Sequence, residues 1–384
     1  MFPPLVSIIL DVLRFVLAVT VLVGHVTQHY FQTQWPDLTL YGYAAVGSFF
    51  VLSGLVIRAL ESRAGAHSIS EFYADRASRL LSVALPAVAL TIVCDAISYR
   101  VASDFYMSNW GQGINLPLVR IAANLTFFSQ PWGWDIALFS NSPFWSLGYE
   151  SGFYVLWGLM VYAQRSSGKW WLPAIGALIY GPNVLVMMVF WFLGINLFEL
   201  TFRQVAISRL RAWLPAIVAV TIMLLFSGMA KRQLFAGKDL FALFGLHVGR
   251  VSFSVMLGGV VTYIVLLPIL LGAQRLTTVR ISPRIVQVAR FLGEATFPLY
   301  LVHLPILVLA RSLHSYDPAS VLQKLAVMLG IVLISAAVVP VASILKYQLR
   351  FGFRRLLEAS APYGRASSTV RATDAVTSSD LSLD

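Results

Sequence analysis

Long apolar runs dominate the chain, and short polar or basic connectors separate them. A run of about 20 apolar residues is long enough to cross a bilayer as a helix, so each such run predicts a transmembrane helix. One run is interrupted by Gly181, Pro182 and Asn183, which form a strong turn signal and divide it into two predicted helices. The pattern predicts about ten transmembrane helices, at residues 5–30, 43–60, 80–99, 144–162, 170–180, 184–200, 212–229, 251–271, 291–311 and 321–345.

Three segments depart from this pattern. The apolar part of residues 100–143 is too short for a full crossing, so we expect a re-entrant or interfacial segment there. Residues 230–249 are expected on the outer side, with a dip back toward the membrane. The tail is small and polar and lacks the apolar content of a core. We therefore expect one transmembrane domain at residues 1–357 and a disordered cytoplasmic tail at 358–384.

Composition agrees with a membrane protein of the all-α class. Hydrophobic residues make up 58% of the 384 residues and charged residues only 12%, against roughly a quarter charged in soluble domains. The mean hydropathy is +0.76. The first run lacks a basic start and a cleavage site, which favours a retained helix over a signal peptide. Cys94 is the single cysteine and no metal-binding motif is present, so neither a disulfide nor a metal site is expected.

The net charge of +11 reflects membrane topology better than it reflects nucleic-acid binding. The basic residues are spread over the connectors, and positively charged connectors are typical of the cytoplasmic side. If these connectors lie inside, both termini are cytoplasmic. The basic residues that mark this side are Arg58, Arg63, Arg76, Arg79, Arg165, Lys169, Arg203, Arg209, Arg211, Arg275, Arg280, Arg284, Arg290, Lys346, Arg350, Arg354 and Arg355.

The first apolar run carries three ionisable residues, Asp11, Arg14 and His25. A charge at membrane depth costs about 2.5 kcal/mol or more, so such residues point to a functional site. Arg14 and His25 are eleven residues apart, which leaves them only ~20° apart around a helix. Asp11 lies on the same stripe, within ~60° of Arg14. Either Asp11 and Arg14 form an ion pair that only joins helices, or the stripe faces a polar cavity where His25 performs chemistry.

Arg76 and Arg79 are three residues apart just before the predicted span 80–99, so they face the same side if a helix enters the membrane there. Two guanidinium groups at this spacing suit an anionic group, above all a phosphate. The alternative is that they are ordinary cytoplasmic arginines at a helix end.

Two later runs also contain polar residues. Glu150 lies in an apolar helix with Ser146 and Tyr154 four residues to either side, and a buried carboxylate needs a partner. It could orient or deprotonate another group, or it could neutralise Arg14. Tyr300 and His303 lie one turn apart in the ninth predicted helix. A lone histidine in a helix bundle is more often a hydrogen-bonded structural residue than a base.

Five motifs, taken together and in order, resemble the acyltransferase 3 family of integral membrane acyltransferases. They are LDVLRFVLAVTVLVGH, FFVLSGLVI, FYADRASRLL, FWSLGYESGFY and FPLYLVHLPI, and the resemblance covers roughly residues 5–345. The resemblance implies a bundle of about ten helices that acylates hydroxyl groups of sugars, polysaccharides or small natural products. The implied donor is acetyl-CoA or a related acyl-CoA.

The resemblance also assigns residues. It implies that His25 is the catalytic histidine, that Arg14 is its essential neighbour, and that Arg76 and Arg79 handle the acyl-CoA. Glu150, Tyr300 and His303 match recurring pocket positions of the family. We expect Glu150 to act with His25 and Arg14 in catalysis, and the substrate pocket to be lined by Asp11, Trp145, Ser146, Tyr300 and His303. The family's proline closely follows the second arginine, whereas here it comes at Pro86, which leaves the local start of the helix open. The chain also lacks the extracytoplasmic hydrolase-like domain of some members.

These observations lead to one main hypothesis and two alternatives. The main hypothesis is an O-acyltransferase of the plasma (inner) membrane that takes an acyl group, acetyl above all, from acyl-CoA to a carbohydrate or glycosylated acceptor. His25 acts as general base or carries the acyl group covalently, and Glu150 or Asp11 fixes its tautomer or stabilises its charged form. The alternatives are a transporter or flippase without acyl transfer, and an assembly protein. Membrane lipids are expected partners, and nucleic acid is not.

Overall fold

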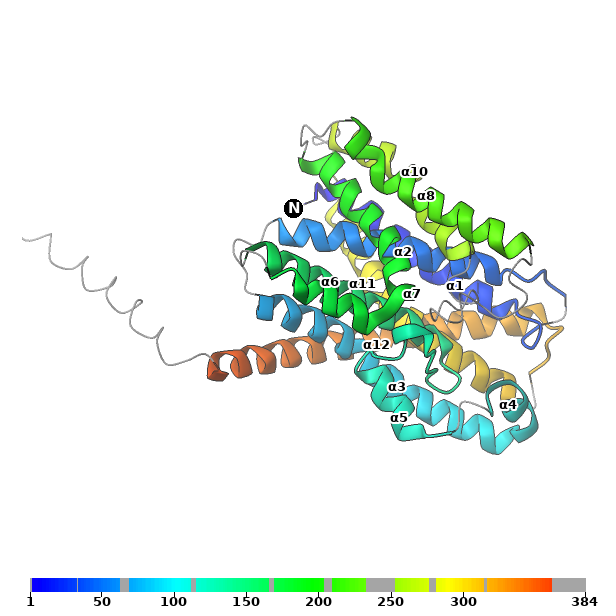
Figure 1. Cartoon of the computed structure of the whole chain (residues 1–384). Coiled ribbons are helices and arrows are strands. Elements are labelled where there is room, and N and C mark those ends of the chain that lie inside the picture. Colours follow the sequence, from blue (N-terminus) through cyan, green and yellow to red (C-terminus); the bar gives the residue numbers. More distant parts are fainter. Residues whose placement is uncertain are drawn as a thin grey trace, which may run out of the picture.

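The computed structural model consists of helices packed side by side along one main direction (Figure 1). It describes residues 2–360 except 33, 63–68, 112–114, 166–168, 204–208, 233–252, 276–280 and 314–315, and this part contains no strand. The long helices are α1 (Pro4–Val26), α2 (Thr39–Glu61), α3 (Ile69–Val101), α6 (Trp145–Arg165), α7 (Trp171–Phe198), α8 (Arg209–Arg232), α10 (Phe253–Arg275), α11 (Pro283–Ser312) and α12 (Val321–Ser360). The short helices are α4 (Ser103–Trp110) and α5 (Pro117–Leu125), and single turns lie at Pro131–Gly133, Ser142–Phe144 and Glu199–Arg203.

Seven of the described helices are long and apolar enough to cross a membrane: α1, α2, α3, α7, α10, α11 and α12. The prediction of an all-α, multi-pass membrane bundle is thereby confirmed. The number of about ten crossings and the cytoplasmic placement of the termini stay predictions.

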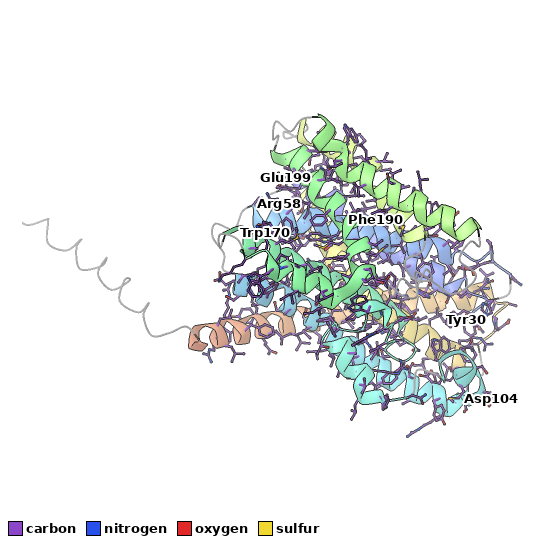
Figure 2. The ribbon with its side chains drawn as sticks, viewed as in Figure 1. Tyr30, Arg58, Asp104, Trp170, Phe190 and Glu199 are labelled. Atoms are coloured by element: carbon purple, nitrogen blue, oxygen red, sulfur yellow. The ribbon has the colours of Figure 1, made fainter. Side chains whose placement is uncertain are left out.

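The bundle has two distinct ends (Figure 2). Arg58, Trp170 and Glu199 lie at one end, which we call the basic end, and Tyr30 and Asp104 lie at the opposite end, the loop end. An ion pair between α2 and the end of α7 lies at the basic end, with Nε of Arg58 2.5 Å from Oε1 of Glu199. The basic end is the predicted cytoplasmic side.

Helix α7 doubles back on itself at Gly181, whose backbone leaves the helical region with φ 77° and ψ 178°. Gly176 packs on Leu156, and Trp191 stacks edge-on against Trp157 at 5.6 Å between ring centroids. Fifteen residues of straight helix would separate Gly176 from Trp191 by about 22 Å, so neighbouring contacts on α6 require a reversal. The two arms therefore form the hairpin that the Gly-Pro-Asn turn predicts.

Helix α2 lies at the centre of the bundle and packs against α1, α7 and α10. Glycines make the closest of these contacts possible. A Cβ atom at Gly47 or Gly258 would lie 1.8 or 1.9 Å from a carbonyl oxygen of the facing helix, and one at Gly54 or Gly194 would lie 2.1 or 1.9 Å from one. These distances are far below van der Waals contact, so the backbones of α2, α7 and α10 meet directly, as small residues allow in membrane bundles.

The segment between α3 and α6 returns to the bundle without crossing it. Its two helices, α4 and α5, have eight and nine residues, which is too short for a membrane span. Beyond them the chain enters the bundle, where Asn141 donates hydrogen bonds to Thr91 of α3 and to the carbonyl of Leu301 in α11, both at 2.8 Å. Whether this segment is re-entrant or interfacial stays a prediction.

Two helix boundaries differ from the prediction. Helix α3 begins at Ile69 and passes through Pro86, so both arginines of its first turns lie inside a helix despite the displaced proline. Helix α12 continues to Ser360, well past the predicted end of the last span at residue 345. The predicted dip in residues 230–249 and most of the predicted tail, 361–384, lie outside the described residues.

Replacing Gly54 by alanine is expected to destabilise the bundle, because the new methyl group would push α7 away from α2. Overpacking of this kind costs about 1–3 kcal/mol, which should lower the unfolding temperature in detergent by several degrees. Gly330→Ala in α12 is the matched control, since nothing lies within 4 Å of the position where its Cβ would be. Equal unfolding temperatures for the two variants would contradict this account of the packing.

Candidate active site

Two cavities adjoin inside the bundle. The larger, the arginine cavity, has a volume of about 100 Å³ and the smaller, the histidine pocket, about 20 Å³, room for roughly one water. Both are lined by Val46 and Tyr300, so they meet at these two side chains. The polar residues of the arginine cavity are Arg14, Ser53, Arg79, Ser146, Glu150, Thr296 and Tyr300, and those of the histidine pocket are His25, Thr39, Tyr43, Trp145 and Tyr300.

The ionisable stripe of α1 reaches both cavities. Arg14 lines the arginine cavity, and Nη1 of Arg14 lies 3.4 Å from Oδ1 of Asp11, which stands behind it. The predicted ion pair is therefore present, and it holds a residue of the cavity wall. His25, three turns farther along α1, lines the histidine pocket.

Glu150 of α6 is held by hydroxyl groups. Its Oε1 accepts hydrogen bonds from Tyr154, one turn later, and from Ser53 of α2 at 3.1 Å. The indole Nε1 of Trp191 in α7 donates to Ser53 in turn, at 3.3 Å. Residues of three helices thus hold the Glu150 carboxylate at the wall of the arginine cavity, close to its arginine side chains.

The paired arginines take different positions. Arg79 lines the arginine cavity, and Arg76 lies behind it with its guanidinium carbon 6.0 Å from the centre of the Tyr154 ring. Nε and Nη1 of Arg76 are buried and have no hydrogen-bond partner among the described residues. Buried guanidinium nitrogens without partners are costly, so an anionic ligand at this place would satisfy them.

His25 is oriented by its own chain, through Gln28 in the turn that follows α1. Nδ1 of His25 lies 3.2 Å from Oε1 of Gln28, and the Tyr30 hydroxyl donates to the same oxygen at 2.5 Å. Burial raises the pKa of Tyr30 to about 12, so this hydroxyl keeps its proton. Oε1 of Gln28 is a hydrogen-bond acceptor for Tyr30, so it is an acceptor for Nδ1 of His25 as well. Nδ1 therefore carries the proton, and the lone pair of His25 lies on Nε2.

This arrangement corrects one expectation from the sequence. Glu150 and Asp11 do not fix the tautomer of His25, because each is bonded elsewhere: Glu150 to Ser53 and Tyr154, and Asp11 to Arg14. For Asp11 the reason is its distance from His25 along α1, because it precedes His25 by fourteen residues, or about 21 Å of helix.

His303 of α11 packs directly against His25, with 5.1 Å between the ring centroids. The side chain is fully buried, and its Nδ1 lies 3.1 Å from the carbonyl oxygen of Leu299. A carbonyl only accepts, so Nδ1 carries the proton and Nε2 is an acceptor, which has no partner among the described residues. Beside His25 there is therefore a second imidazole with an unused lone pair.

Tyr300 stands between the two cavities and is tied to the start of α6. Its hydroxyl lies 2.9 Å from Oγ of Ser146 and 3.2 Å from the carbonyl oxygen of Pro143. Trp145 follows in the wall of the histidine pocket. The three residues predicted here, Trp145, Ser146 and Tyr300, thus lie together at the junction of the cavities.

Two residues that hold the wall of the histidine pocket were not predicted from the sequence. Asp95 of α3 accepts hydrogen bonds from the Ser140 hydroxyl at 2.6 Å and from the Ser140 backbone N–H at 3.0 Å. Asn141 binds α3 and α11 as described above, so the chain leading to Trp145 is fixed on both sides. An acidic residue inside a predicted transmembrane run was a usable signal for Asp95, whereas nothing in the sequence marked Asn141.

No group of three or more His, Cys, Asp or Glu side chains suited to a metal ion occurs in the described part of the chain. Comparison with known proteins gives a family: the model of the acyltransferase domain, that of the acyltransferase 3 family, matches residues 8–346. The matched range includes every candidate site residue from Asp11 to His303. No curated protein and no solved structure matches the chain.

Asp95→Ala is expected to loosen the wall of the histidine pocket. The N–H and hydroxyl of Ser140 would lose their buried acceptor, at a cost of about 1–3 kcal/mol for each unsatisfied group. Thermal unfolding in detergent should show the loss, together with faster proteolysis between α5 and α6. Asp104→Ala, which removes an exposed acidic residue of α4, serves as control, and an equal effect of both substitutions would disprove the anchoring role.

Proposed function

The chain belongs to the acyltransferase 3 family of membrane acyltransferases, and on this premise we propose that it transfers an acyl group from acyl-CoA to a hydroxyl of a carbohydrate or glycosylated acceptor. We further propose that the donor enters from the basic end, that acceptor and His25 meet toward the loop end, and that the membrane is the plasma (inner) membrane. Membrane lipids surround the bundle as its other partners.

The observation that carries the proposal is the pair of adjoining cavities. One contains the cations of the basic side, Arg14 and Arg79, and the other contains a histidine with an available lone pair. A donor with phosphates at one end and a reactive thioester at the other fits this arrangement, in which one cavity contains cationic side chains and the other contains the histidine. Anionic and reactive ends would then be separated along α1, and Tyr300 lies where the arm of the donor must pass.

The distance between Arg14 and His25 assigns their roles. Eleven residues of helix separate them, which is about 17 Å at ~1.5 Å per residue. Arg14 is therefore too far from His25 to touch a thioester that is being attacked there. We place Arg14 with Arg79 in donor binding, where the two would balance the charge of the donor, and keep the catalytic role for His25.

In the proposed reaction, Nε2 of His25 takes the proton of the acceptor hydroxyl while its oxygen attacks the thioester carbonyl. The carbon–sulfur bond breaks, an ester forms, and the imidazolium returns its proton to the leaving thiolate, which gives the thiol. The unpartnered Nε2 of His303, in the ring beside it, would stabilise the positive charge that His25 gains during the reaction. Gln28 would hold the imidazole in the reactive tautomer.

The size of the histidine pocket supports a short acyl group. A volume of about 20 Å³ accommodates little more than one water-sized group, which fits acetyl far better than a long chain. Acetyl-CoA is accordingly the donor we propose.

His25→Ala is expected to lower kcat for acyl transfer by at least ~100-fold, because general base catalysis contributes about 10²–10⁴. The assay measures thiol release from acetyl-CoA by the purified protein with a panel of free and lipid-linked sugars. His29→Ala is the matched control, since His29 is exposed at the loop end outside both cavities. Both variants should unfold near the wild-type temperature.

The same assay separates the alternatives. Full acyl transfer by a stably folded His25→Ala protein would exclude the proposed chemistry, and transport of a sugar without any thiol release would favour a transporter. Double-reciprocal plots at several acceptor concentrations should intersect, as expected when both substrates are bound together. Parallel lines would instead indicate an acyl group carried on the enzyme.

Removing both paired arginines, as Arg76→Ala with Arg79→Ala, is expected to weaken acetyl-CoA binding by more than tenfold. Each charge-assisted hydrogen bond contributes about 1.5–3 kcal/mol, and ~1.4 kcal/mol corresponds to tenfold in affinity. Equilibrium binding of acetyl-CoA tests this without knowledge of the acceptor. Arg284→Ala removes an exposed positive charge from the start of α11 and should leave the affinity unchanged. Equal affinities for the wild type and the double variant would contradict the assignment.

A further inference from the structure

The last helix brings additional basic residues to the paired arginines. Arg350 of α12 pairs with Asp75 of α3: Nη2 donates to Oδ2 at 3.1 Å, and Nε lies 2.7 Å from Oδ1 without a hydrogen-bonding angle. Asp75 directly precedes Arg76 in the sequence. The pair therefore fixes α12 against the part of α3 that carries the two arginines, at the end where α12 extends beyond its neighbours (Figure 1).

The register of the two helices places Lys346 beside Arg79. Helix α3 runs from the basic end toward the loop end, and α12 runs the opposite way, since Lys324 near its start lies over the Trp35 ring in the loop that follows α1. Lys346 precedes Arg350 by one turn, and Arg79 follows Asp75 by one turn. Because the two helices are antiparallel, one turn back from Arg350 on α12 and one turn forward from Asp75 on α3 both point toward the loop end. Lys346 therefore lies at the level of Arg79.

Charge at this place is unbalanced. Lys346 is close enough to Arg79, Arg76 and Arg350 for all three to repel its charge, and Glu294 of α11 is its acidic neighbour. Neither Lys346 nor Arg79 forms an ion pair within the described residues, and two nitrogens of Arg76 are buried without partners. Like charges that form no ion pair of their own repel one another, so the cluster of Arg76, Arg79 and Lys346 suits a ligand with several negative charges.

We propose that Lys346 determines donor specificity by binding the ribose 3′-phosphate of acyl-CoA, while Arg76 and Arg79 bind the diphosphate. This proposal rests on the proposed function. Arg79 lines the cavity that leads to Tyr300, so the phosphates nearest the pantetheine arm belong with the arginines. Lys346 is exposed at the outside of the cluster, where the nucleotide end of the donor lies. A lysine ammonium is a compact charge that suits a terminal phosphate.

A competing source for the same chemistry is the phosphate of a lipid headgroup. A lysine at the end of a membrane helix commonly extends to the interface and binds anionic lipid. The two sources differ in what Lys346 discriminates: a donor-binding lysine senses the 3′-phosphate of a soluble nucleotide, whereas an interfacial lysine senses the composition of the bilayer.

The test compares acetyl-CoA with acetyl-3′-dephospho-CoA as donors, in nanodiscs of phosphatidylcholine alone and in nanodiscs with added anionic lipid. Lys346→Met should raise KM for acetyl-CoA about tenfold, since a charged hydrogen bond contributes about that factor. It should leave KM for the dephospho donor within about twofold, and kcat unchanged. Lys346→Arg should restore most of the preference for acetyl-CoA.

Arg355→Met is the matched control. Arg355 lies nine residues beyond Lys346, which turns it to the opposite side of α12, and its guanidinium carbon lies 4.3 Å from the centre of the Phe351 ring. This variant removes a basic residue from the same end of the same helix and should leave both KM values unchanged.

Several results would overturn the proposal. Equal shifts of KM for both donors, or equal effects of Lys346→Met and Arg355→Met, would show that Lys346 does not sense the 3′-phosphate. An effect that appears only with anionic lipid would assign Lys346 to a lipid headgroup. Each of these results leaves acyl transfer itself standing, whereas a wild-type protein that releases no thiol from either donor would overturn the proposed function and this inference with it.

Discussion

The cost of placing charge inside an apolar bundle determines much of this structure. Among the described residues, several ionisable groups in the helices are held by a specific partner on another segment. Arg58 of α2 binds Glu199 at the end of α7, Asp95 of α3 binds the segment before α6, and Arg350 of α12 binds Asp75 of α3. Since each partner comes from a different part of the chain, these bonds also fix which helices are neighbours.

Ionisable groups that lack such a partner include residues of the candidate site. Two nitrogens of Arg76 and the Nε2 of His303 are buried and lack partners within the described chain, and Arg79 opens onto a cavity. A folded protein retains such groups at a cost of about 1–3 kcal/mol for each, and a ligand bound in the adjoining cavities would supply the missing partners. An anionic ligand would satisfy the nitrogens of Arg76, and a ligand that donates a hydrogen bond would satisfy Nε2 of His303. Two different ligands are what a reaction with two substrates would supply.

The sequence was sufficient for features that depend on local pattern. The apolar runs predicted the long helices, the Gly-Pro-Asn turn predicted the reversal in α7, and the spacing of Asp11 and Arg14 predicted their ion pair. It was not sufficient for partners that depend on tertiary placement. Asn141 is an ordinary loop residue until the chain brings it between Thr91 of α3 and Leu301 of α11. Lys346 looks like any basic residue at a helix end until Arg350 fixes α12 against α3. Such partners are set by helix register, which no single run encodes.

The separation of Arg14 from His25 also bears on how a donor could reach the histidine. If the phosphates of a donor bind near Arg79, its acyl end must pass Tyr300, because this side chain lines both cavities. Its hydroxyl is bonded to Ser146 and to the carbonyl of Pro143, and breaking two such bonds costs only about 1–3 kcal/mol in total. Binding of several phosphates exceeds that cost easily. A closed junction in the ligand-free bundle is therefore compatible with acyl transfer, and it keeps the basic end and the loop end apart until a donor binds.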